Sequence, residues 1–411
     1  MSKLNELLQG LCSDGIPFQK ISECCVLEKG KTPIQKAIPG KYPLVVTTSE
    51  RKTSNTFQFD RPSVCIPLVS SRGHGVASLN EIFYQEGQFA LGNILCAVTP
   101  IDPTILSAKF LHIYLNYAKN TLLVSQMKGG ANVSLSIDAI GRCKIPVPPL
   151  EIQREIVRIL DSFTSLTVEL SAELSARQKQ YSHYQEHLLT FNSDITWKPI
   201  SDVFTVKNGY TPSKANSDYW ENGTVPWVRM EDIRSNGRII NDTIKKVNTS
   251  AIKKSGAFPA GSTLISTTAT IGEYALLAVN AITNQQITCL TIKKEFEKIL
   301  LPKFVFHYAY IIGEWCKKNV NQSGGLPIIS TEKLKQFQFP VPPLDVQQRI
   351  VNVLDNFDAI CSDLNIGLPA EISARQKQYE YYRDLLLSFK NIDNITDRQT
   401  DRQTDRQTEH N

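Results

Sequence analysis

A long internal repeat constrains the architecture of this chain more than any other sequence feature. Residues 146–161 (PVPPLEIQREIVRILD) return as residues 340–355 (PVPPLDVQQRIVNVLD), at an offset of 194. Residues 175–181 (SARQKQY) return as residues 373–379 at an offset of 198, so the second copy has gained four residues in between. A repeat of this length predicts that one structural unit occurs twice in the fold.

Each repeated segment is predicted to form a long helix that begins after a Pro-Pro pair, where a missing N–H group is tolerated. Apolar residues recur at alternating spacings of four and three, which is typical of a coiled-coil seam. The seam of the first copy contains Ile156, Leu160, Phe163, Leu170, Leu174, Tyr181, Tyr184 and Leu188. The seam of the second copy contains Ile350, Leu354, Phe357, Cys361, Leu364, Leu368, Tyr379, Tyr382 and Leu386. About 40 residues at 1.5 Å each give roughly 60 Å of helix. We therefore expect the two helices to pair with each other; the alternative is that each is a core helix of its own module.

The four additional residues of the second copy predict a local change in the course of its helix. An insertion of four residues shifts the heptad phase of a coiled coil. Gly367 and Pro369 lie at this point, and proline in particular breaks or bends a continuous helix. We therefore expect a kink there.

Each predicted helix follows a longer, mixed segment. Turn signals between short apolar runs, such as Lys29-Gly30 and Asn208-Gly209, predict α+β modules with several short strands. The predicted domains are module 1 (1–145), a central spacer helix (146–195), module 2 (196–339), a C-terminal spacer helix (340–390) and a tail (391–411).

Charge is divided along the same boundaries. Module 1 has 15 Lys and Arg against 10 Asp and Glu, and module 2 has 18 against 11. The two helical segments have 4 against 7 and 5 against 7. Two basic modules on an acidic scaffold favour binding to nucleic acid, because neutralised phosphates supply much of protein–DNA affinity.

The residues needed for catalysis are missing from the sequence. Gly30-Lys31-Thr32 resembles the end of a phosphate-binding loop, but Cys25 stands where the motif needs glycine. His183 and His187 are spaced for a shared metal on a helix, but the second copy does not repeat them. Motifs of amino-methyltransferases and of nucleases are also missing. We expect a non-catalytic protein without a cofactor or metal of its own.

The sequence also indicates a cellular compartment. Its nine cysteines contain no Cys-x-x-Cys pair, so free thiols in a reducing cytoplasm are the simplest interpretation. The first residues lack the apolar core of a signal peptide, and no apolar run approaches the roughly 20 residues of a membrane span. We expect a cytoplasmic protein.

Taken together, these motifs resemble the specificity subunits of type I restriction–modification systems over nearly the whole chain. The resemblance rests on the two PVPPL helix starts, on residues 153–157 (QREIV) and 347–351 (QQRIV) just behind them, and on the repeated ARQKQY segment. In module 2 it also rests on residues 208–213 (NGYTPS), 219–223 (YWENG), 226–228 (PWV), 270–272 (TIG), 284–286 (NQQ) and 323–325 (SGG). Module 1 departs more from the pattern, which leaves its individual DNA contacts open.

The resemblance implies a specific assembly. Two target-recognition domains, in inverted orientation about a pseudo-twofold axis, each read a few base pairs of a bipartite DNA target. Antiparallel spacer helices set the gap between the half-sites. Two methyltransferase subunits dock on the scaffold and bind S-adenosylmethionine, and two motor–nuclease restriction subunits, which use ATP and Mg²⁺, can join them.

Hydrogen-bonding side chains on the loops of both modules are the candidates for DNA contacts, because base edges are distinguishable in the major groove. In module 1 they are Arg51, Lys52, Arg72 and His74. In module 2 they are Tyr210, Thr211, Ser213, Arg229, Arg234, Lys245, Lys246, Asn284 and Gln285. For each of them, the alternative is a phosphate contact or a role within a turn.

Two short repeats add further hypotheses. Residues 167–174 form a tandem tetrapeptide (TVEL-SAEL), and each unit adds about 6 Å of helix, so its copy number is predicted to set the half-site spacing. The tail repeats Thr-Asp-Arg-Gln three times from Thr396. Only a GACA tract encodes all four residues by repetition, which predicts a slippage-prone gene and phase variation. The polar tail itself is predicted to be disordered.

Two alternative functions remain at the sequence level. The chain could be the recognition subunit of a two-subunit restriction enzyme in which methylation and cleavage share the other chain. It could also be a coiled-coil adaptor that binds only protein, although this explains the helices and not the basic modules.

Overall fold

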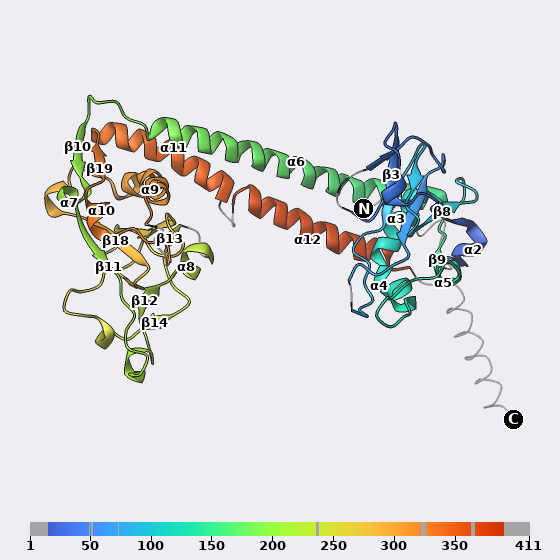
Figure 1. Cartoon of the computed structure of the whole chain (residues 1–411), viewed down its shortest axis with the longest axis horizontal. Coiled ribbons are helices and arrows are strands. Elements are labelled where there is room, and N and C mark those ends of the chain that lie inside the picture. Colours follow the sequence, from blue (N-terminus) through green and yellow to red (C-terminus); the bar gives the residue numbers. More distant parts are fainter. Residues whose placement is uncertain are drawn as a thin grey trace, which may run out of the picture. The chain divides into compact units, whose positions relative to one another are not determined.

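The computed structural model describes residues 15–48, 50, 52–72, 74–235, 238–321, 326–362 and 366–389. The chain forms two compact units (Figure 1). Unit 1 combines Met1–Val168 with Ser373–Asn411, and unit 2 contains Glu169–Ile372. Each unit therefore holds one module together with parts of the long helices. None of the described helices has the length and apolar character needed to cross a bilayer. The predicted tail, residue Leu364 and the 323–325 loop lie outside the described residues.

The module of unit 1 is built on three small sheets. Strand β1 (Phe18–Lys20) pairs with β9 (Lys144–Pro146). A four-stranded sheet has the order β2-β8-β5-β6, with β2 at Cys25–Lys29, β8 at Leu95–Pro100, β5 at Ser63–Pro67 and β6 at Phe83–Gln85. A three-stranded sheet has the order β4-β3-β7, with β4 at Lys52–Ser54, β3 at Tyr42–Val45 and β7 at Ala90–Leu91. The helices are α2 (Ile21–Cys24), α3 (Ala108–Tyr117), α4 (Lys119–Leu122) and α5 (Ile137–Arg142).

The module of unit 2 repeats this topology. Strand β10 (Thr196–Pro199) pairs with β19 (Gln338–Val341). The larger sheet has the order β11-β18-β15-β16-β13, with β11 at Phe204–Asn208, β18 at Ile287–Ile292, β15 at Thr263–Ser266, β16 at Tyr274–Leu277 and β13 at Ile239–Ile240. The smaller sheet has the order β14-β12-β17, with β14 at Lys246–Val247, β12 at Val225–Val228 and β17 at Ile282–Thr283. The helices are α7 (Ile200–Val203), α8 (Met230–Ser235), α9 (Pro302–Lys318) and α10 (Thr331–Lys335). Apart from β13, every strand of unit 2 has a counterpart in unit 1, so the repeat includes the modules and confirms the predicted α+β class.

The long helices pair within each unit, as their seams predicted. Helix α6 (Leu150–Leu188) lies antiparallel to α12 (Leu368–Leu387) in unit 1 and to α11 (Leu344–Ser362) in unit 2 (Figure 1). In unit 1 the rings of Phe163 and Tyr382 stack with their centroids 5.4 Å apart. In unit 2 the ring of Phe357 stacks on Tyr181 and on Tyr184, at 5.9 and 5.3 Å. The pairing predicted from the seam is therefore confirmed inside both units.

At the position of the predicted kink the second long helix is interrupted, so two helices lie where the sequence predicted one bent helix. Helix α11 ends at Ser362 and α12 begins at Leu368, so Gly367 precedes the new helix and Pro369 lies in its first turn. Proline is tolerated in a first turn, where its missing N–H would have no partner in any case.

A buried glutamine joins each module to its helix in the same way. Gln153 in α6 is fully buried, and its Nε2 donates to the carbonyls of Ile105 and Pro148, both at 2.7 Å, while its Oε1 accepts from the Ser107 N–H at 2.8 Å. Gln347 in α11 makes the same three bonds, to the carbonyls of Ile299 at 2.8 Å and Pro342 at 2.7 Å and from the Leu301 N–H at 2.9 Å. The glutamine and its three partners all differ in number by 194 between the two copies, the offset of the sequence repeat. Because a buried polar group is costly when unpaired, this bond set explains why the glutamine recurs.

A salt bridge repeats in the same register. Lys109 on α3 pairs with Asp161 on α6 at 2.5 Å, and Lys303 on α9 pairs with Asp355 on α11. Unit 2 adds the buried His307, whose Nε2 lies 2.8 Å from an Asp355 oxygen. Burial opposes ionisation of Asp355, but the hydrogen bonds from His307 and Lys303 outweigh it and lower the pKa of this carboxyl.

Candidate nucleic-acid interface

The predicted contact residues of module 2 gather at one edge of its smaller sheet. Strands β12 and β17 are parallel, so their carboxyl ends meet at the same edge. Arg229 follows β12, and Asn284 follows β17 with its N–H donating to the Val228 carbonyl at 3.0 Å. Tyr210 joins them because its N–H donates to the Thr283 carbonyl at 2.7 Å. We call this set, with Thr211 and Gln285, the reading edge of module 2.

Side-chain hydrogen bonds connect this reading edge. Thr211 Oγ1 donates to Gln285 Oε1 at 2.6 Å, and Asn284 Nδ2 donates to Gln286 Oε1 at 3.1 Å. Gly209 permits the close approach, because a Cβ there would lie 2.0 Å from Thr283 Oγ1. The loops that carry Tyr210 and Asn284 are therefore held against the sheet, and the exposed Gln285 lies at the surface.

Arg229 is held in place by aromatic and acidic neighbours. Its guanidinium lies 5.5 Å from the Trp227 ring, and its Nη2 lies 2.9 Å from a Glu231 oxygen. Its Nε is buried and has no hydrogen-bond partner among the described residues. Trp227 is itself fixed, because its Nε1 donates to the Tyr210 carbonyl at 3.2 Å. With 18% of its side chain exposed, Arg229 is a pre-organised cation, and arginine is the commonest specific partner of guanine.

The Tyr210 side chain is engaged inside the module. Its hydroxyl donates to the Ala251 carbonyl at 3.1 Å and accepts from the Lys253 N–H at 3.0 Å. The Lys253 ammonium lies 4.2 Å from the ring centroid. In this structure Tyr210 thus positions the loop that carries Lys253, which adds a further cation beside the reading edge.

The other candidates of module 2 lie around this edge. Ser213 is exposed, and its carbonyl accepts from Trp220 Nε1 at 3.1 Å. Arg234 is exposed on α8 and donates to Thr270 Oγ1 at 3.2 Å. Lys245 and Lys246 lie across β12, and Lys246 is paired with Asp242 at 2.9 Å. None of these four residues belongs to the reading edge.

The candidates of module 1 are more scattered. Lys52 is opposite Leu44 on β3, the position that Lys245 takes opposite Trp227 on β12. Arg72 and His74 lie on the exposed loop after β5, where His74 has a left-handed backbone (φ 59°). Arg51 lies outside the described residues.

Strand register identifies residues of module 1 that the sequence alone did not. The Gly92 N–H donates to the Val45 carbonyl at 2.9 Å, which matches the bond between Asn284 and Val228 in module 2. Asn93 therefore corresponds to Gln285. Val46 and Gly92 correspond in the same way to Arg229 and Asn284, and we call Val46, Gly92 and Asn93 the reading edge of module 1. By the pairing of β2 with β8, Lys29 likewise corresponds to Asn208. A signal was present, because Lys29-Gly30 and Asn208-Gly209 are turn signals at the same place in the two modules.

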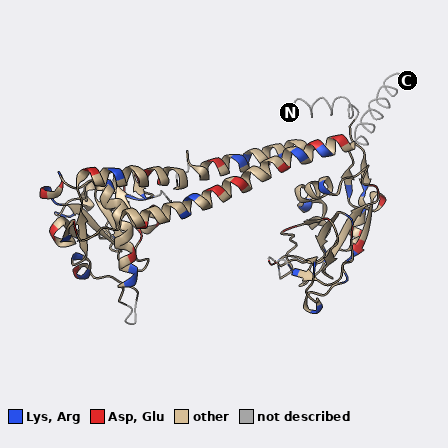
Figure 2. Ribbon diagram, turned by 90° about the horizontal axis from the view of Figure 1, so that it is seen from above, with Lys and Arg blue, Asp and Glu red and all other residues tan. Residues whose placement is uncertain are grey.

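Charge along the helices differs from that of the modules. Asp and Glu alternate with Lys and Arg along the long helices (Figure 2). The basic excess of the sequence therefore belongs to the modules, where the reading edges lie.

His183 and His187 stack with their ring centroids 6.3 Å apart. The described residues contain no group of three or more His, Cys, Asp or Glu that could hold a metal ion.

Comparisons with known proteins agree with this architecture. The model of the family described as the type I restriction modification DNA specificity domain matches residues 15–178 and again residues 192–374. The EcoR124I/EcoR124II specificity subunit of Escherichia coli is 36% identical over 316 residues, which cover 73% of this chain and 75% of that protein. The EcoprrI specificity subunit, also of E. coli, is 43% identical over 204 residues, and that match spans only 51% of its length.

A solved structure shows the same fold. The type I restriction–modification S subunit from M. genitalium aligns with a TM-score of 0.56 and 15% identity, over 92% of this chain and 97% of that one. Two matched domains that together cover most of the chain, and two modules of one topology, lead to one conclusion: the chain belongs to the type I restriction modification DNA specificity family.

Proposed function

We propose that this chain gives a type I restriction–modification complex its DNA specificity and has no catalytic site of its own. Each module would read one half of a bipartite target. The paired helices would fix the spacing between the two half-sites. Half-sites that are read from the same face of a duplex lie one helical turn apart, about 34 Å, or a multiple of that distance. The observation that carries the proposal is that two basic modules of one topology are each joined to the helices by the same buried glutamine.

The catalytic steps belong to partner subunits in this proposal. Two methyltransferase subunits would bind the scaffold and supply the S-adenosylmethionine site. Two restriction subunits would add ATP- and Mg²⁺-dependent translocation and cleavage. The relatives named above are subunits of type I restriction enzymes, which supports this division of labour.

Methylation mapping tests the proposal. N6-methyladenine is mapped across the host genome in the wild type, in a deletion of this gene and in the complemented deletion. We expect one bipartite motif to lose methylation in the deletion and to regain it on complementation. Retention of every motif after deletion would refute the proposed function.

A binding measurement separates the proposal from a protein-only adaptor. The chain is combined with its methyltransferase partner and titrated with duplex DNA at rising salt concentrations. Counterion release predicts an affinity that falls steeply with salt, together with a preference for the mapped motif. An adaptor that binds only protein would show neither property.

A further inference from the structure

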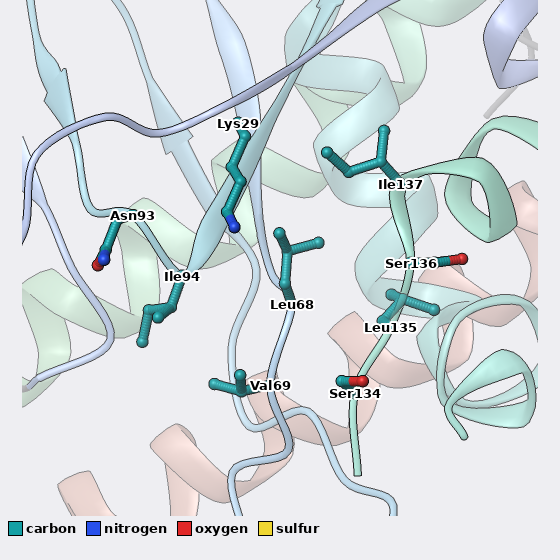
Figure 3. Close-up of a pocket in the computed structure, with 9 residues that line it drawn as sticks. All are labelled: Lys29, Leu68, Val69, Asn93, Ile94, Ser134, Leu135, Ser136 and Ile137. Carbon is teal, nitrogen blue, oxygen red and sulfur yellow. The ribbon is translucent and has the colours of Figure 1, made fainter. Parts of the chain in front are cut away.

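Module 1 has a pocket beside its reading edge. The pocket has a volume of about 350 Å³. Figure 3 shows it between the end of β2, the turn before β8 and the chain that leads into α5. Leu68, Ile94 and Ile137 contribute apolar surface, and Lys29 and Asn93 contribute polar groups.

Among the described residues that line this pocket, Lys29 is the one cation. In Figure 3 its side chain points into the space between Ile94 and Leu68. Lys29 is exposed, and among the described residues its Nζ has no hydrogen-bond or ion-pair partner. The neighbouring Lys31, by contrast, is paired with Glu28 at 3.1 Å. An unpaired ammonium above an apolar wall suits a ligand that presents an acceptor next to an apolar group.

The same place in module 2 is filled by a polar network. Leu68 corresponds to Thr267, because the N–H groups of these residues donate to the equivalent carbonyls of Ile94 and Gln286. Thr267 Oγ1 lies 2.8 Å from Thr288 Oγ1, and Thr288 Oγ1 donates to Asn208 Oδ1 at 2.8 Å. The two modules thus have this site at the same place in the fold but line it with different side chains. Such a difference is expected if each module recognises a different base.

The loops around the pocket also carry the exposed cationic candidates of module 1. Val69, which lines the pocket, pairs with Ser134 in an isolated bridge. The loop that follows carries Arg72 and His74, and the Gly75 N–H donates to the Ala131 carbonyl at 3.3 Å. The pocket therefore lies among the loops that would face DNA, and loops positioned by a rigid scaffold commonly carry binding residues.

We propose that this pocket reads a thymine in the half-site of module 1. In the major groove a thymine presents an O4 acceptor beside its C5-methyl group. The methyl group would contact Leu68 and Ile94, and Lys29 would donate to O4. The inference rests on the proposed DNA specificity and names one base that the site would take.

Deoxyuridine substitution tests this inference, because it removes only the methyl group. The full chain is assembled with its methyltransferase partner and titrated with duplexes that carry the mapped motif. Each thymine of both half-sites is replaced singly by deoxyuridine. Loss of one buried methyl group predicts an affinity about fourfold lower at one position. Replacements in the other half-site serve as the internal reference.

Variants of the pocket identify the residues responsible. Ile94→Gln introduces the residue type found at the equivalent position of module 2, and Ile94→Ala provides a second variant in case one folds poorly. Both are expected to discriminate less than the unaltered chain between the thymine and deoxyuridine duplexes at that position, because only the contact with Leu68 remains. Ile38→Ala is the matched control, since Ile38 is an exposed apolar residue of module 1 outside the pocket, and it should keep the fourfold discrimination.

The outcomes separate this inference from the proposed function. Sequence-specific binding without any deoxyuridine effect, or an effect that is undiminished in both Ile94 variants, would overturn the pocket assignment alone. Absence of sequence-specific binding by the unaltered complex would overturn the proposed function and the assignment with it.

Discussion

The two modules agree at their junctions with the helices and differ at their reading edges. At the junctions, Gln153 and Gln347 make identical bond sets, and the Lys–Asp bridges lie in the same register. At the edges, module 2 has Arg229 where module 1 has Val46. A buried amide with three partners accepts little change, whereas the residue that follows the equivalent strand differs in size and charge between the modules. The comparison shows how a shared scaffold can hold readers of different specificity.

Removal of the buried glutamine should have the largest effect. Gln153→Ala and Gln347→Ala each leave one buried N–H and two carbonyls without partners and open a cavity. We expect each to lower the free energy of unfolding by about 3 kcal/mol or more. Chemical denaturation measures the loss, and Gln348→Ala, at an exposed position one residue away, is the control. If one of the two variants lost clearly less free energy of unfolding than the other, the two junctions would not be equivalent.

A substitution in the reading edge of module 2 should have the next largest effect, and the effect should be on DNA affinity rather than on stability. Arg229→Ala is expected to weaken binding of the mapped motif by about 10- to 100-fold, because a base contact contributes about 1–3 kcal/mol. Arg349→Ala, an exposed arginine on α11, is the matched control and should change the affinity little. An equal loss on unrelated DNA would show that Arg229 contacts phosphate and not a base.

The repeated salt bridges should contribute less to the free energy of unfolding, and their contribution should depend on pH. Asp355→Asn should cost about 1 kcal/mol, and Asp161→Asn less, because Asp355 also accepts a hydrogen bond from the buried His307. The pKa of Asp355 is lowered on folding, so its contribution is present above the unfolded pKa of about 3.9 and is lost as the pH falls through the lower folded value. Unfolding curves at several pH values should therefore converge for the wild type and Asp355→Asn at strongly acidic pH. A gap that stays constant down to that range would contradict the assigned ion pair.

The tandem tetrapeptide tests the helices without touching either edge. Deletion of residues 171–174 removes about 6 Å of α6 and should shorten the spacer between the half-sites by one or two base pairs. Both half-site sequences should be unchanged in the methylation map. An unchanged spacer would show that the helix length does not set the distance.

Much of this architecture could be predicted from the sequence, because its strongest signals are local. The seam spacing predicted the helix pairing, and Gly367 and Pro369 predicted a kink at the place where the structure separates α11 from α12. The equivalence of the modules was much harder to see, because short strands need only an apolar pattern that many sequences satisfy. Lys29 and Asn93 meet at one pocket through strand register, although 64 residues separate them. Their proximity can be recognised only once the pairing of the strands is known.

The central claim is that each module reads its own half-site on a common scaffold. Asn93→Ala in module 1 and Gln285→Ala in module 2 change corresponding positions of the two reading edges, and N6-methyladenine mapping measures the motif of each variant. We predict that each variant relaxes a different half-site and leaves the other half-site and the spacer unchanged. A change in the same half-site from both variants, or in the spacer from either, would contradict the account.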